Sequence, residues 1–98
     1  MVRINDDGID CVVVKTQYAN NGRVALVLVD ANDGAPVTVA TVNFPEASLA
    51  SDEAVIKDYS ENDGVLDVLV KAKVVEPTDR VVSISRYVPP QPVVKVLV

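Results

Sequence analysis

The sequence contains no histidine, no tryptophan and only one cysteine among its 98 residues. Without histidine there is no Ser-His-Asp or Cys-His catalytic arrangement and no histidine-bearing zinc site. The single cysteine, Cys11, cannot form an intramolecular disulfide bond or build a thiolate cluster. We therefore expect a protein that is not an enzyme, that carries no metal or cofactor, and that works in a reducing cytoplasm.

Aromatic residues are also scarce, which leaves little material for stacking nucleic-acid bases. The four aromatic residues are Tyr18, Phe44, Tyr59 and Tyr87. The formal net charge is −5, and such a chain is repelled by phosphate backbones and attracted to basic protein surfaces. The composition thus favours a partner with a basic protein surface and predicts no direct binding to nucleic acid.

Long hydrophobic runs are absent as well. The longest apolar runs, such as residues 24–29, are far too short to cross a bilayer. The opening residues 1–7 lack the basic and then apolar pattern of a signal peptide. We expect no association with a membrane.

Valine, by contrast, is abundant and accounts for 23 of the 98 residues. Because β-branched side chains favour strands, this composition predicts a protein built largely from sheet. A chain of this length can bury one modest core. The sequence thus predicts a single domain over residues 1–98, and both a monomer and a homodimer remain open.

The first half of the chain predicts an antiparallel meander with strands over residues 2–5, 9–18, 23–30 and 37–44. Asn20-Asn21-Gly22 and Asn32-Asp33-Gly34 separate the later strands, and these residue types tolerate the positive φ of tight turns. The strand over 23–30 is apolar on both faces, so we expect it to be central and covered.

The second half predicts one helix over residues 61–73. Ser60 and Asp63 match the Ser-x-x-Asp capping box, while Leu66, Leu69 and Val70 share one helical face. Pro77 is expected to stop this helix.

Further extended segments are predicted around this helix. Residues 54–56 before it fit either a strand or the approach to the helix. After it, residues 80–84 and 93–98 favour strands, and the proline-rich segment 89–92 between them favours a surface crossing. The valine-rich segment 93–98 could also exchange between subunits. The predicted fold is α+β: a mostly antiparallel, twisted sheet of about five strands with one helix packed on one face.

A polar segment over residues 57–64 stands out among the valines. Lys57 and Glu61 carry opposite charges, Tyr59 offers a rigid amphipathic ring, and tyrosine is enriched at interaction hot spots. The predicted protein-contact residues are Lys57, Asp58, Tyr59, Glu61 and Asn62. In the alternative interpretation Tyr59 packs over the core, Ser60 caps the helix, and the charges are only solvated.

Two acidic segments superficially match a calcium-binding loop. In the loop that begins at Asp30, glycine comes fifth rather than sixth, and position twelve is Thr41. In the loop that begins at Asp58, position six is Asp63 and position twelve is Leu69. We interpret the first as a hairpin turn and the second as a capped helix start. Arg23, Arg80 and Arg86 could bind an anion only if strand pairing brought them together.

Several segments within residues 23–80 match a family pattern. The matching segments are Arg23-Val24-Ala25-Leu26, Leu28-Val29-Asp30-Ala31, Asp33-Gly34, Pro36-Val37, Ala40-Thr41-Val42-Asn43, Ile56-Lys57-Asp58-Tyr59-Ser60-Glu61-Asn62, Gly64, Leu66 and Val74-Val75-Glu76-Pro77-Thr78. On these residues the chain resembles a small family of uncharacterised proteins carried by bacterial plasmids, phages and related mobile elements. The proline-rich segment 89–92 departs from that family pattern.

The resemblance implies a domain of unknown function rather than an activity. Its mobile-element context implies a protein-interaction module that blocks a component of a host defence system, as anti-CRISPR proteins of similar size and acidity do. The alternative is a small-molecule binder that sequesters a signalling nucleotide. That alternative requires a pocket with arginine or lysine and an aromatic wall.

Overall fold

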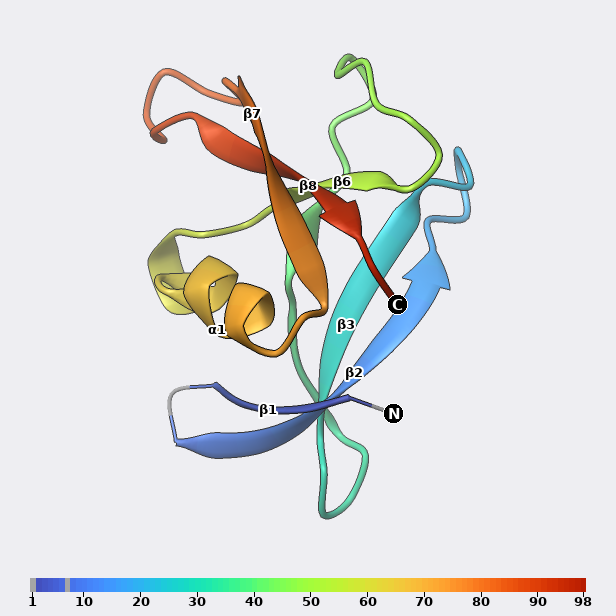
Figure 1. Ribbon diagram of the computed structural model, residues 1–98, viewed down its shortest axis with the longest axis vertical. Coiled ribbons are helices and arrows are strands. Elements are labelled where there is room, and N and C mark those ends of the chain that lie inside the picture. The colour runs from blue at the N-terminus through green and yellow to red at the C-terminus, as the bar shows by residue number, and fades with distance from the viewer. Residues whose placement is uncertain (1, 7) are drawn as a thin grey trace.

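The computed structural model describes residues 2–6 and 8–98 and contains two antiparallel sheets and one α-helix (Figure 1). The first sheet has the strand order β1-β2-β3-β4. Its strands are β1 (Arg3–Asp6), β2 (Ile9–Gln17), β3 (Val24–Asp30) and β4 (Pro36–Val39). The predicted meander is therefore present, and β3 takes the interior position that its two apolar faces predicted.

The second sheet has the strand order β5-β6-β8-β7. Its strands are β5 (Thr41–Val42), β6 (Glu53–Ile56), β7 (Val75–Val82) and β8 (Gln91–Val96). The α+β class is confirmed, but the prediction of one sheet with about five strands is wrong, because eight strands form two sheets among the described residues.

The difference arises at Ala40, inside the segment 37–44 that was predicted as one strand. The amide of Ala40 donates to the carbonyl oxygen of Leu26 in β3 at 2.8 Å, while its own carbonyl accepts from the amide of Lys57 at 2.8 Å. The chain thus bonds to the first sheet before Ala40 and to β6 after it. A strand that passes between sheets at such a corner keeps its apolar composition, so the sequence gives no sign of the break.

The helical region is shorter than the predicted span 61–73. A 3₁₀ turn, η1 (Ser60–Asn62), precedes the helix α1 (Val65–Lys71). Gly64 between them has φ of 90°, in the left-handed region that a right-handed helix cannot continue through. Lys73, also with positive φ, follows the helix, so Pro77 is not what ends it.

Pro77 instead lies inside β7, the outer strand of the second sheet. An outer strand tolerates the missing amide donor of proline. The segment 54–56 is a strand, β6, which begins at Glu53. The strands predicted over 80–84 and 93–98 are present but begin and end earlier, as β7 (Val75–Val82) and β8 (Gln91–Val96). Residues 91 and 92 of the proline-rich segment therefore belong to β8.

Both sheets and the helix bury side chains in a common core. α1 contributes Val65 and Leu69, which are fully buried and pack with residues of both sheets. α1 contacts β1 and β7, and Figure 1 shows it between these two strands. The helix therefore covers one side of the structure, as predicted.

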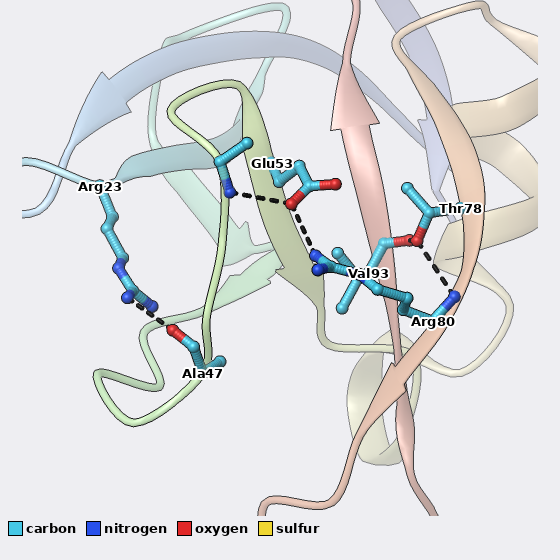
Figure 2. A network of polar contacts seen from close by, with 7 residues as sticks. Arg23, Ala47, Glu53, Thr78, Arg80 and Val93 are labelled. Atoms are coloured by element: carbon cyan, nitrogen blue, oxygen red, sulfur yellow. Dashed lines mark hydrogen bonds and ion pairs between the residues drawn. The ribbon is translucent and has the colours of Figure 1, made fainter.

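Polar side chains fix the second sheet and the loop between β5 and β6 (Figure 2). The guanidinium of Arg80 in β7 reaches the carboxylate of Glu53 in β6 at 2.6 Å, and the guanidinium of Arg23 donates to the carbonyl oxygen of Ala47 at 2.6 Å. No helix within residues 2–6 and 8–98 is long and apolar enough to cross a membrane.

Candidate functional site

The segment 57–62 leads from β6 into η1, and the structure gives its residues different roles. Asp58 and Asn62 hold the segment in place, whereas Lys57 and Tyr59 line an open groove. The backbone of Glu61 lies in η1, but its side chain is outside the part of the chain that the structure describes. The prediction that all five residues form one contact surface therefore needs correction.

Asp58 stabilises the start of α1. Its Oδ1 accepts hydrogen bonds from the amides of Gly64 at 3.0 Å and Leu66 at 3.2 Å. These amides belong to the helix N-terminus, where no partner within the helix exists for them. A carboxylate at this end also interacts favourably with the helix dipole.

Ser60 does not cap the helix, so the capping-box prediction is wrong. Its φ of 56° places it in the left-handed region, inside the η1 turn rather than at the start of α1. The residues at the N-cap positions are Tyr59 for η1 and Gly64 for α1, and neither makes a side-chain hydrogen bond that caps its helix. The polar side chain that the helix needs is supplied by Asp58, six residues before Gly64.

Asn62 was predicted as an exposed contact residue, and this prediction is wrong because Asn62 is fully buried. Its Nδ2 donates to the carbonyl oxygen of Val39 at 2.8 Å, and its Oδ1 accepts from the hydroxyl of Thr38 at 2.8 Å. Both partners belong to β4. A buried polar side chain needs such partners, and here they tie η1 to the outer strand of the first sheet.

The groove lies where β4, β5 and the segment after β6 meet. It has a volume of about 480 Å³ and is largely open to solvent. Its lining residues are Tyr18, Thr38, Val39, Thr41, Val42, Lys57 and Tyr59. The groove is thus lined by two tyrosines, two threonines, one lysine and two valines, of which Val39 is exposed.

Two side-chain contacts help to fix the tyrosines that line this groove. The hydroxyls of Tyr18 and Thr41 lie 2.8 Å apart and share a hydrogen bond. On the other side, Lys57 Nζ lies 5.5 Å from the centroid of the Tyr59 ring, within the range of a cation–π interaction. Both tyrosines are half-buried, so each ring is partly fixed and partly available to a ligand.

Sequence reasoning missed Tyr18, Thr38 and Thr41. Tyr18 follows the end of β2, far from Tyr59 in the sequence, and only the corner at Ala40 brings the two together. The scarcity of aromatic residues is the one sequence signal that could have drawn attention to Tyr18.

Gln91 supports the groove from the start of β8. Its Oε1 accepts from the amide of Asp58 at 2.8 Å, and its Nε2 donates to the carbonyl oxygen of Pro89 at 2.8 Å. Gln91 is buried. The side chain therefore fixes the segment that carries Lys57 and Tyr59 relative to the loop between β7 and β8.

The residues weighed as metal or anion ligands have other contacts. Asp30 Oδ1 accepts from the amide of Asn32 at 2.8 Å, which agrees with the interpretation of that loop as a turn. No group of three or more Cys, Asp or Glu side chains within the described residues is arranged to hold a metal ion.

The three arginines are engaged separately, so the described structure assembles no common anion site from them. Arg23 donates to backbone carbonyls of the loop after β5, and Arg80 pairs with Glu53. The guanidinium of Arg86 lies 5.4 Å from the ring centroid of Tyr87.

Comparison of the chain with protein-family models, with curated proteins and with solved structures finds no match. The candidate site therefore rests on its own geometry, which combines an open groove, two partly fixed tyrosines and one lysine.

Proposed function

We propose that the protein is a non-enzymatic protein-interaction module whose contact surface centres on the groove between Tyr18 and Tyr59. The observation that carries this proposal is the gathering of two of the chain's four aromatic side chains at one open surface. Tyrosine combines a large apolar ring with a hydroxyl and loses little conformational entropy on binding, which suits it to protein contacts.

The partner that we propose is a basic protein segment, carried by a host protein or nucleoprotein complex. The net charge of −5 favours the approach of such a segment. Within the groove, the tyrosine rings can accept the apolar stems and cationic heads of arginine and lysine.

The biological role that we propose follows from the resemblance of residues 56–62 to proteins of mobile genetic elements. A small acidic protein that occupies the basic surface of a host defence complex would inhibit it, as anti-CRISPR proteins do. The groove is largely open to solvent. That openness favours an extended protein segment over an enclosed nucleotide, which is usually buried over most of its surface.

The test is capture of a defined partner from host lysate, followed by titration of the purified pair by calorimetry. We expect the variant with Lys57→Ala and Tyr59→Ala to bind about 30-fold more weakly, the effect of losing a hot-spot contact. Tyr87→Ala is the matched control, because Tyr87 is exposed but lies outside the groove. Equal binding by the groove variant and the wild type would reject this surface.

A thermal-shift panel of signalling nucleotides separates the second function class. A nucleotide at 100 times its dissociation constant would stabilise the folded protein by about 2.7 kcal/mol. We expect no nucleotide to raise the melting temperature. A clear rise that Tyr59→Ala abolishes would replace the protein-binding proposal with nucleotide sequestration.

A further inference from the structure

Lys57 and Tyr59 both line the groove because the chain that carries them is extended. Tyr59 has φ of −152° and ψ of 170°, and side chains two residues apart in an extended chain point to the same side. Asp58, between them, does not line the groove and instead accepts from the amides of Gly64 and Leu66 at the start of α1. The local backbone therefore brings the lysine and the tyrosine together.

The backbone around Tyr59 is held on both sides. The amide of Asp58 donates to Oε1 of Gln91 at 2.8 Å, and the carbonyl oxygen of Tyr59 accepts from the amide of Asn62 at 3.0 Å. The ammonium of Lys57, in contrast, sits on a flexible stem of methylene groups. A ligand that reaches the ring of Tyr59 can thus displace the ammonium, while the ring stays in place.

The ring of Tyr59 already has a cation beside it. Lys57 Nζ lies 5.5 Å from the ring centroid, within the distance of about 6 Å over which a cation is attracted to an aromatic face. Of the described residues that line the groove, Lys57 is the only charged one. A cation of a bound partner would therefore compete at this ring with a cation of the chain itself.

We propose that Lys57 acts as an internal competitor at Tyr59, so that the ring strengthens the binding of a partner's arginine but not of a partner's lysine. This inference rests on the proposed binding of a basic segment at the groove. A partner's lysine would replace one contact between an ammonium and the ring by an equivalent contact, and such an exchange gains almost no free energy. An arginine gains more, because its planar guanidinium stacks on an aromatic ring and is more weakly hydrated than an ammonium.

Thr38 offers a further contact that suits a guanidinium. Its hydroxyl donates to Oδ1 of Asn62 at 2.8 Å, so towards the groove this hydroxyl can only accept hydrogen bonds. A guanidinium that stacks on a ring keeps its in-plane N–H groups available to acceptors beside the ring. The groove thus favours a partner segment that presents arginine.

Two blocked peptides of equal length and charge test this selectivity, one alternating arginine with glycine and the other alternating lysine with glycine. Fluorescence anisotropy of the dye-labelled peptides gives their dissociation constants for the full chain at one ionic strength. Tyr59→Leu fills the half-buried position with an apolar side chain but removes the aromatic face. We expect it to weaken binding of the arginine peptide by about 10-fold and of the lysine peptide by less than about 2-fold.

Tyr59→Leu is then combined with Lys57→Met, which keeps a long side chain but removes its charge. Without the competitor the ring is open to both cations, so Tyr59→Leu should now weaken the lysine peptide as well, by about 3-fold or more. Lys57→Met alone should tighten the binding of both peptides. Lys73→Met is the matched control, because it removes an exposed lysine outside the groove and changes the net charge equally. In that background the lysine peptide should still be insensitive to Tyr59→Leu.

Two results would overturn the proposal while leaving the groove as a binding site. In the first, Tyr59→Leu weakens the lysine peptide as strongly as the arginine peptide when Lys57 is intact. In the second, it weakens only the arginine peptide even in the Lys57→Met background. If Tyr59→Leu changed the binding of neither peptide in either background, the groove itself would be rejected as the site for a basic segment.

Discussion

The side-chain amide of Asn62 donates to the backbone carbonyl of Val39 at 2.8 Å, and so joins the turn before α1 to the outer strand of the first sheet. Asn62 also accepts from the hydroxyl of Thr38, so its side chain satisfies two polar groups of β4 at once. The two residues are 23 positions apart in the sequence. The walls of the groove are thus fixed relative to each other by one buried amide.

We expect Asn62→Ala to lower the free energy of unfolding by about 1–3 kcal/mol, because it removes a fully buried side chain and leaves the Val39 carbonyl and the Thr38 hydroxyl without their partner. Urea unfolding followed by circular dichroism measures this difference. Asn32→Ala is the matched control, since Asn32 is exposed in a turn and should change stability by less than about 0.5 kcal/mol. Similar losses in the two variants would show that Asn62 has no special structural role.

A second prediction separates the two candidate caps of α1. Asp58→Ala removes the acceptor for the amides of Gly64 and Leu66 and should cost about 0.5–2 kcal/mol, the usual effect of losing a helix cap. Ser60→Ala should have almost no effect on stability. The reverse order in thermal unfolding would restore Ser60 as the capping residue.

The early strands could be predicted because their signals are local. Turns at Gly22 and Gly34, both with positive φ, separate apolar segments, and the strands β1 to β3 follow within one or two residues of the predicted bounds. The corner at Ala40 could not be predicted, because its cause is the pairing of one segment with two sheets. That pairing depends on residues distant in the sequence, such as Leu26 and Lys57.

In the candidate site, too, local features could be predicted from the sequence, whereas contacts between distant residues could not. Polarity alone identified the segment 57–64, and Lys57 and Tyr59 do line a groove. Polarity could not distinguish an exposed asparagine from one that is buried against a strand, as Asn62 is. It also favoured a local cap at Ser60, whereas the folded chain brings the carboxylate of Asp58 to the helix from six residues before Gly64.

A third prediction concerns the loop after β5. The guanidinium of Arg23 donates to the carbonyl oxygens of Phe44 at 2.9 Å and Ala47 at 2.6 Å, so Arg23→Ala should speed hydrogen exchange in residues 43–52. Arg23→Lys should not restore protection, because an ammonium lacks the planar fork that reaches separate carbonyls.

Arg3→Ala provides the control for this experiment. Arg3 and Asp10 form an exposed ion pair at 3.9 Å, and such pairs contribute little to stability. Hydrogen exchange measured by mass spectrometry should be unchanged in residues 43–52 of Arg3→Ala. If Arg23→Ala exchanged at the wild-type rate in this loop, its hydrogen bonds to the carbonyls would be irrelevant to loop order.

The last prediction concerns Cys11, whose thiol is fully buried in the core. Burial raises the pKa of this thiol, and the nearby carboxylates of Asp6, Asp30 and Asp10 raise it further. The folded protein therefore keeps the proton at a pH where the unfolded chain has released it. Because the folded state then binds more protons, the free energy of unfolding should fall as pH rises above about 8.5.

Cys11→Ala removes this contribution, so the difference in stability between wild type and variant should shrink between about pH 8 and 10. Contributions that are common to the two proteins cancel in the comparison. Urea unfolding at each pH measures the difference, and slow alkylation of the native thiol by iodoacetamide provides independent evidence of burial. A difference that stays constant with pH, together with rapid alkylation, would mean that Cys11 ionises in the folded protein as readily as in the unfolded chain.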